Sequence, residues 1–273
     1  VLESESSTRD AAPPDAVHWL IARAEAEEYL AGITTRLSLS GLRCKPTVLE
    51  GHVAEQILCF AEMERSDLIV MSSHGEKGVT EWSLGSTTEK VLARARASVL
   101  LVPADGNGAL RAHEASLERI LILLDGSPRA ETVLPPLERL AREQNAALVL
   151  LHVATPPQLF ESNPPSAEDA SFRRQLYVRN ERGARRYLAD VRARLTHKGC
   201  EVHEIVEKGD LRSVLPGIAI RERIDLIAIT SHGRTGDPTR CYGDTAAHLI
   251  RNARAPVLIC LLYTSDAADE GHC

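Results

Sequence analysis

The chain has 273 residues, 44% of them apolar, and a formal net charge of −6 from 32 basic and 38 acidic residues. This composition lacks the excess of basic residues that is typical of nucleic-acid-binding proteins. No apolar run approaches the roughly 20 residues that span a bilayer. The N-terminus lacks the charged and then apolar plan of a signal peptide. We therefore expect a soluble, cytoplasmic protein that binds neither nucleic acid nor membrane.

The chain contains six cysteines and ten histidines. No C-x-x-C pair occurs among them, and they do not show the spacing of metal ligands. The prediction is free thiols in a reducing compartment and no metal site.

Residues 1–103 are predicted to form an α/β domain whose first two strands are largely missing. Val1 and Leu2 have the character of a strand end, and a long segment of helical spacing then runs to a stop at Gly41. Short apolar runs indicate buried strands. The predicted elements are a strand end at 1–2, a helix at 15–39, a strand at 44–49, a helix at 52–65, a strand at 68–71, a helix that opens at Gly85 and a strand at 98–102.

Residues 104–117 have the turn residues and low apolar content of a linker, and residues 118–260 form a second, complete domain. Five strands alternate there with four helices, which predicts a parallel, doubly wound sheet. Its first elements have no counterpart in the first half, so we expect the natural N-terminus to lie upstream. These elements are a strand at 120–124, a turn at 125–128, a helix at 129–144 and a strand at 147–153.

Residues 261–273 also have no counterpart in the first half. The segment from Cys260 to Asp269 resembles the translation of a transposase sequencing adapter, so we exclude the tail from the fold prediction. No weight is placed on His272 or Cys273.

The two halves are copies of each other. Residues 25–102 align without a gap to residues 183–260 at a constant offset of 158, and 26 of 78 positions are identical. A period this long indicates two whole domains, because solenoid repeats are far shorter. Continued to the chain start, the same offset places Leu2 opposite Phe160. Identical pairs include Tyr29/Tyr187, Gly41/Gly199, Gly51/Gly209, Asp67/Asp225, His74/His232 and Gly85/Gly243.

A glycine-punctuated loop follows the strand at 68–71. Ser72 stops the strand, Gly75 lets the backbone approach a ligand, and Gly85, Ser86 and Thr87 open a helix. The first amides of a helix lack internal partners and carry the positive end of its dipole, so these residues suit a phosphate group. The alternative is a tight turn followed by a Ser-capped helix.

The second half has a candidate site at two of its strand ends. Asp125 follows the first strand, and His232 and Gly233 follow the fourth. Doubly wound sheets bind ligands beyond the carboxyl ends of their strands, where strand order reverses. If these strands are neighbours, both turns face one crevice, in which Asp125 can accept hydrogen bonds from a ribose. The alternative is an Asp-Gly turn that caps the next helix.

The segment LILLDGSPRAE, strand ends of the form D-L-I-x-I-x-S-H-G and the closing A-P-V-L-I resemble the universal stress protein family, here as a tandem pair. The resemblance covers nearly the whole chain apart from its tail. It implies an α/β fold of two doubly wound domains with parallel five-stranded sheets of strand order 3-2-1-4-5, the first incomplete. It also implies a stress-response protein that binds ATP, with or without Mg²⁺.

ATP-binding members of that family carry the motif G-x2-G-x9-G-[S/T]. The first half matches it with Ser72, Gly75, Gly85 and Ser86, and departs from it only at the first position. The resemblance therefore implies that the first half is the nucleotide-competent one.

The second half matches the motif less well. Thr230, Gly233 and Gly243 occupy its first three positions, but Asp244 replaces the hydroxyl residue. A carboxylate there would repel a triphosphate by on the order of 1 to 4 kcal/mol. Two further residues match the family's nucleotide-contacting positions after the first two strands, namely Asp125 and Val153.

The two half-sites are expected to be incomplete in different ways, because the better phosphate loop belongs to the domain that lacks its first strand. Without their central neighbours, the strands at 44–49 and 68–71 should expose apolar edges. The resemblance also implies that the strands at 98–102 and 256–260 pair across a pseudo-twofold axis as an internal dimer. The alternative is two domains joined only by the linker.

Three functions stay open at this point. The first is an ATP-binding regulatory protein, in which bound nucleotide changes the surface presented to a protein partner. The second is a nucleotide-independent scaffold of the same fold, and the third is a slow ATPase, to which only His74 points. Neither His74 nor Cys241 is assigned a catalytic role, because no partner follows at a defined spacing. Walker-type and hydrolase-elbow motifs are absent.

Overall fold

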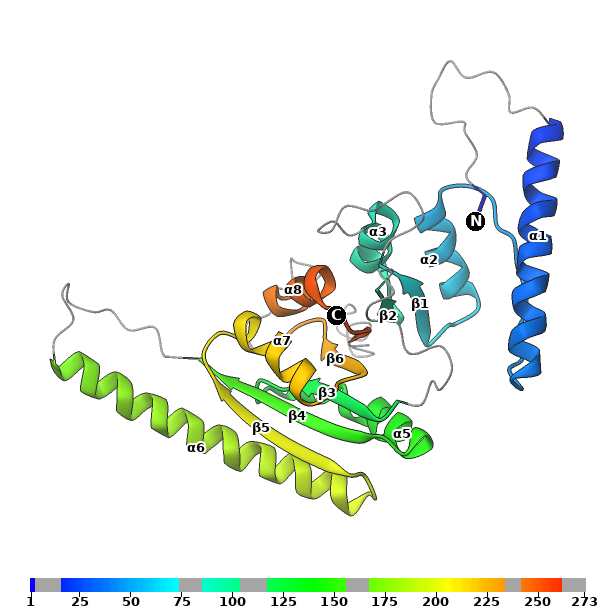
Figure 1. The fold of residues 1–273 in the computed structure, drawn as a ribbon. Helices are drawn as coiled ribbons and strands as arrows, with labels where there is room; N and C mark the ends of the chain where they lie inside the picture. The colour runs from blue at the N-terminus through cyan, green and yellow to red at the C-terminus, as the bar shows by residue number, and fades with distance from the viewer. Residues whose placement is uncertain (3–15, 74–84, 104–116, 156–166, 234–241, 262–273) are drawn as a thin grey trace, which may run out of the picture.

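The computed structural model describes residues 1–2, 16–73, 85–103, 117–155, 167–233 and 242–261. Within these residues the chain builds one mixed sheet of seven strands, in the order β1-β2-β7-β6-β3-β4-β5 (Figure 1). The predicted α/β fold is confirmed, and the strands of the two halves form one continuous mixed sheet. Predictions for His74, Gly75, Cys241, residues 104–116 and residues 262–273 lie outside the described residues.

The strands of the second half all run parallel to one another. Their sheet order is β5-β4-β3-β6-β7, which is 3-2-1-4-5 when these five are numbered along the chain. Asp225 joins the starts of β3 and β6, because its Oδ2 accepts hydrogen bonds from the backbone N–H groups of Glu118 and Arg119, both at 2.9 Å. The strands are β3 Arg119–Leu123, β4 Ala147–Ala154, β5 Val202–Lys208, β6 Leu226–Thr230 and β7 Val257–Cys260.

Helices cover both faces of this part of the sheet, and strand side chains alternate between the faces. Ile120 and Ile122 pack with residues of α5 and α6, whereas Leu121 and Leu123 pack with residues of α7 and α8. All four side chains are buried, as continuous apolar runs in parallel strands require. The helices are α4 Pro128–Glu131, α5 Leu134–Gln144, α6 Ala167–His197, α7 Leu211–Arg221 and α8 Asp244–Asn252.

The helix predicted at 129–144 is interrupted. Ser127 caps α4, since its hydroxyl oxygen accepts a hydrogen bond from the N–H of Ala130 at 3.2 Å. Turn residues including Val133 then separate α4 from α5. Pro135 and Pro136 stand in the first turn of α5, and because they have no N–H to donate, the helix restarts there.

The first half confirms the predicted helices but not every strand. The strand predicted at 44–49 is wrong: among the described residues, this segment's β contact is a single parallel bridge between Leu2 and Glu50. A strand requires a hydrogen-bonded partner along its length, and Leu2 supplies only one residue of it. The elements are α1 Ala16–Leu39, α2 Val53–Met63, β1 Leu68–Ser72, α3 Ser86–Arg94 and β2 Ser98–Val102.

The bridge also corrects the alignment at the chain start. The counterpart of Glu50 is Lys208, which pairs with Ala154 of β4. Leu2 therefore takes the place of Ala154 and not that of Phe160, so the offset of 158 does not extend back through this loop.

Within the described residues, strand β1 forms an edge of the sheet and pairs only with β2. Its Leu68 and Val70 side chains are 43% and 60% exposed, whereas the counterparts in β6, Leu226 and Ala228, are buried. The expected apolar edge is confirmed for this strand. The difference arises because Leu226 and Ala228 belong to the core cluster that α5 and α6 cover, whereas Leu68 and Val70 belong to no core cluster of the described residues.

The two halves meet at strands β2 and β7, which pair antiparallel. Val99 lies opposite Ile259, and Leu101 lies opposite Val257. These four side chains are buried, so the contact continues the hydrophobic core between the halves. In the part of the chain that is described, no helix combines the length and the apolar character needed to cross a membrane.

Candidate ligand cleft

A cleft opens at the carboxyl ends of β3, β4 and β6. β3 lies between β4 and β6, so the connections that leave β3 and β6 run to opposite sides of the sheet. Doubly wound sheets bind ligands at this reversal of strand order. The cleft volume of about 770 Å³ falls in the range of roughly 300–1,000 Å³ that is typical of small-molecule sites. The strand ends, the start of α8 and one side of α6 form its walls.

Asp125 lies on the cleft wall directly after β3. Its Oδ1 accepts hydrogen bonds from the backbone N–H and the hydroxyl of Ser127, at 2.9 and 2.6 Å. Its Oδ2 lies toward Gly233, where a Cβ would collide with the carboxylate. Glycine is therefore required by space at this position. The turn expected as an alternative is present too, although the helix cap is Ser127.

The ends of β4 and β6 contribute Val153 and Thr230. Thr230 is buried, and its hydroxyl donates to the carbonyl oxygen of His232 at 2.9 Å, which holds the turn after β6. Val153 is half-buried next to the end of β3. Five predicted contact residues thus line one cavity, namely Asp125, Val153, Thr230, Gly233 and Gly243.

The start of α8 forms a further wall of the cleft. Gly243 precedes the helix, and its N–H donates to the carbonyl oxygen of Ser231 at 2.8 Å. Asp244 is the first helical residue and lines the cleft. A carboxylate suits the positive end of the helix dipole, and it places a negative charge at this wall of the cleft.

The first half repeats this turn at the start of α3. The N–H of Gly85 donates to the carbonyl oxygen of Ser73 at 3.1 Å, which matches the bond that Gly243 makes. Ser86 and Thr87 are the first residues of α3, and Ser72 ends β1. The predicted hydroxyl residues therefore stand where the unpaired amides of the helix begin.

Tyr187 of α6 lines the cleft but was not predicted as a functional residue. Its hydroxyl is buried and makes no hydrogen bond of good geometry with the described residues, although the Glu131 carboxylate lies close enough to interact with it. Burial, followed by the negative charges of Glu131 and Asp125, raises the pKa of this phenol, so it remains an O–H donor. Its identity with Tyr29 in the repeat is the sequence signal that marks it.

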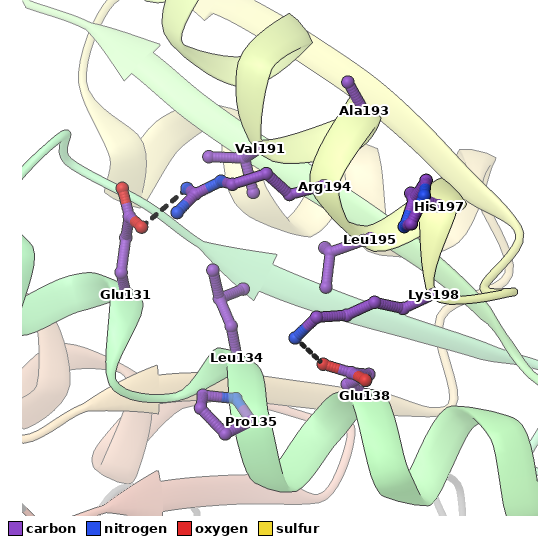
Figure 2. Close-up of a pocket in the computed structure, with 10 residues that line it drawn as sticks. All are labelled: Glu131, Leu134, Pro135, Glu138, Val191, Ala193, Arg194, Leu195, His197 and Lys198. Atoms are coloured by element: carbon purple, nitrogen blue, oxygen red, sulfur yellow. Dashed lines mark hydrogen bonds and ion pairs between the residues drawn. The ribbon is translucent and has the colours of Figure 1, made fainter.

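A second groove, of about 640 Å³, lies between α4, α5 and the C-terminal part of α6 (Figure 2). Figure 2 shows two ion pairs across it, Arg194 with Glu131 at 2.6 Å and Lys198 with Glu138 at 2.7 Å. Because these charged groups neutralise each other, we interpret the groove as a helix-packing feature and not as a ligand site.

The described residues contain no group of three or more His, Cys, Asp or Glu side chains arranged to hold a metal ion. Four cysteines are described and all have free thiols. Cys44 and Cys59 are exposed, and Cys200 and Cys260 are buried.

A strand, turn and helix unit repeated in one sheet, with a cleft at the strand reversal, defines a tandem α/β protein of the doubly wound class. The model of the universal stress protein family matches residues 2–103 and again residues 116–260. The chain therefore belongs to the universal stress protein family and carries two copies of its domain.

Individual relatives agree with this assignment. A universal stress protein of Mycolicibacterium smegmatis is 25% identical over 224 residues, which make up 80% of this chain and 69% of that protein. One from Methanocaldococcus jannaschii is 36% identical over 78 residues, or 29% of this chain and 48% of that protein. The chain thus spans about half the length of the first curated relatives it matches.

Solved structures show the same fold. A universal stress protein from Archaeoglobus fulgidus DSM 4304 superposes with a TM-score of 0.65 at 21% identity, covering 92% of this chain and 84% of that one. A universal stress protein from Pseudomonas aeruginosa UCBPP-PA14 gives a TM-score of 0.61 at 16% identity, covering 86% of this chain and 78% of that one. At these identities the likeness concerns the fold alone.

Proposed function

We propose that this chain is a cytoplasmic, adenine-nucleotide-binding regulatory protein, in which occupancy of the cleft and not turnover is the signal. The observation that supports this most strongly is the meeting of Asp125 with Gly233 at the strand reversal. The Asp125 carboxylate can accept hydrogen bonds from the two hydroxyls of a ribose, and Gly233, which has no side chain, leaves room for the sugar to approach. The ligand's base would lie along the apolar strand ends near Val153.

Phosphate preference should differ between the two halves. Ser86 and Thr87 present hydroxyls at the start of α3, so the first half is proposed to accept the phosphates of ATP, with Mg²⁺ if the metal accompanies them. Asp244 stands at the equivalent position in the second half and disfavours phosphate groups at the start of α8 by on the order of 1 to 4 kcal/mol.

Calorimetry with adenosine, ADP and ATP tests the proposal. Asp125→Asn should weaken adenosine binding about tenfold, the effect of losing a hydrogen bond to a charged acceptor. Asp190→Asn is the matched control, because Asp190 is exposed on α6 and does not line the cleft. If none of the three ligands binds saturably at millimolar concentration, the proposal fails and the nucleotide-independent scaffold is favoured.

A reciprocal exchange tests the phosphate preference. Ser86→Asp should remove the gain in affinity from adenosine to ATP that the start of α3 provides in the first half, and Asp244→Ser should raise the ATP affinity of the second half by removing a negative charge at the start of α8. If both variants bind ATP with the affinity of the unmodified chain, the starts of α3 and α8 do not determine the phosphate preference, and this assignment is wrong.

Slow ATP hydrolysis is a second candidate, because a histidine follows the strand end in each half. His232 lies with its Nδ1 at 3.2 Å from the Ser231 hydroxyl oxygen, and its counterpart is His74. ATP turnover that survives His74→Ala would exclude that histidine as its source.

We also propose that the two halves act as an internal dimer. The antiparallel pairing of β2 with β7 supports this arrangement, because it hides two strand edges that isolated halves would expose.

A further inference from the structure

The outward face of α6 carries a cluster of arginines. Within α6 there are eight arginines against four carboxylates, in a chain whose formal net charge is −6. Four of the arginines line one open hollow of about 650 Å³ around Gly183, and all four are exposed. We call them the arginine face, which consists of Arg174, Arg179, Arg182 and Arg186.

These arginines differ from the others on the same helix in their partners. Arg185 pairs with Glu181, Arg192 with Glu204 and Arg194 with Glu131, each within 4.0 Å. None of the arginine face is paired with a carboxylate of the described residues. Like charges three and four positions apart destabilise a helix, so an unpaired cluster of this kind is costly unless an anion neutralises it.

The arginine face is continuous with the cleft. Arg179 and Gly183 line the hollow and the cleft at the same time. Gly183 has no neighbouring atom within 4 Å of where a Cβ would stand, so the passage between the two is open.

The charged residues that line the cleft also favour phosphate binding on its α6 side. Three carboxylate residues line it, Asp125, Asp210 and Asp244, whereas Arg179 is its one guanidinium or ammonium group among the described residues. Phosphate oxygens are therefore better placed on the α6 side of the cleft than at the start of α8. Arginine is the side chain best suited to them, because its planar fork can donate two parallel hydrogen bonds.

We propose that the arginine face is a phosphate subsite of the second half. A nucleotide whose nucleoside part occupies the cleft sends its phosphates over Arg179 and toward Arg182, away from Asp244. The ligand class is accordingly a nucleotide with an extended phosphate chain, which gains affinity with each phosphate that reaches a further arginine. This inference rests on the proposed nucleotide function of the cleft.

The test is calorimetry at fixed ionic strength on the full chain carrying Ser86→Asp. This substitution is expected to prevent phosphate binding at the start of α3, so that the second half is measured alone. Arg179→Gln should weaken ATP binding about tenfold, as expected for one lost charge-assisted contact, and change adenosine binding less than about twofold. Adding Arg182→Gln should weaken ATP further. Arg192→Gln is the matched control, because it removes a paired arginine of the same helix and should leave both ligands unchanged.

The outcomes separate this inference from the proposed function. If adenosine binds and Arg179→Gln leaves the ATP affinity unchanged, the arginine face is not a phosphate subsite. The proposed nucleotide function is then unaffected. Equal losses for ATP and adenosine overturn the phosphate subsite as well, since they indicate a general disturbance of α6. If ATP is insensitive but the double variant abolishes binding to RNA or to anionic vesicles, the face is a macromolecular surface and the phosphate subsite is wrong. If neither adenosine nor ATP binds the unmodified chain, the proposed function and this inference both fail.

Discussion

Asp125 shows how one side chain can satisfy two sequence interpretations. One carboxylate oxygen holds the turn by accepting two hydrogen bonds from Ser127, while the other lies at the cleft beside Gly233. Because Ser127 restrains the carboxylate, it cannot easily move aside for a larger residue at position 233. The turn and the proposed ligand contact therefore depend on the same rotamer of Asp125.

Tyr187 provides a prediction that separates stability from binding. Its buried hydroxyl makes no hydrogen bond of good geometry in the described structure, so Tyr187→Phe removes a poorly satisfied polar group. The free energy of unfolding should stay the same or rise by up to about 1 kcal/mol. If the hydroxyl donates to the ligand, adenosine binding should weaken about fivefold. Thermal denaturation and calorimetry measure the two effects.

Tyr29→Phe is the matched control, since it makes the same change at the equivalent position of the first half. Tyr29 is 67% exposed, so neither stability nor binding should change. A clear loss of stability in Tyr187→Phe alone would show that the hydroxyl has a structural role and would contradict the prediction.

The helices α1 and α6 are copies of one element in different surroundings. α6 packs on β4 and β5, and Tyr187 and Leu195 are half-buried and buried. In α1, Tyr29 and Leu37 are exposed, because the described residues place no such strands beneath them. Neighbouring strands, and not the local sequence, thus decide the burial of this element.

Strand β7 carries a buried thiol that should make stability depend on pH. Burial raises the pKa of the Cys260 thiol to about 11, against about 8.5 for a thiol in an unfolded chain. Between these values the unfolded chain has lost the proton and the folded chain retains it. The free energy of unfolding should therefore fall as pH rises from about 8.5 to 11, by on the order of 3 kcal/mol.

Urea denaturation at several pH values measures this effect against two variants. Cys260→Ala should flatten the decline, although it lowers stability at every pH because it leaves a small cavity. Cys44→Ala should keep the decline of the unmodified chain, because Cys44 is exposed. Parallel declines in Cys260→Ala and Cys44→Ala would assign the effect to other alkaline groups.

The shared sheet makes a prediction about cooperativity. Ile259 of β7 is fully buried and lies opposite Val99 of β2, so it contacts both halves of the core. Ile259→Ala should lower the free energy of unfolding by about 2 to 5 kcal/mol, and the chain should still unfold in one transition. Native-state hydrogen exchange should show reduced protection in β1, which β7 does not touch.

Ile220→Ala is the control for this experiment, because Ile220 is 80% exposed and the same substitution should change stability by less than about 0.5 kcal/mol. Two separate transitions, with unchanged protection of β1 in Ile259→Ala, would show that the halves fold independently. The internal dimer would then be wrong.

The sequence by itself determined the features that depend on local pattern. Apolar periodicity and glycine stops located the helices of both halves, and the repeat located the equivalent turns at Gly85 and Gly243. The candidate site was predictable to the same extent, because Asp125 and Gly233 follow strands whose order could be inferred. Such features arise from interactions between residues close together in the chain, which a sequence records directly.

Tertiary structure decided what depends on distant partners. The segment 44–49 has strand-forming residues but no strand beside it for more than one bridge, so it stays irregular. The antiparallel register of β2 with β7 sets which residues of the two halves lie opposite each other, and α6 brings Arg179 and Tyr187 to a cleft formed by other strands. Strand pairing and cavity walls require groups that are far apart in sequence to meet, and no local pattern specifies that meeting.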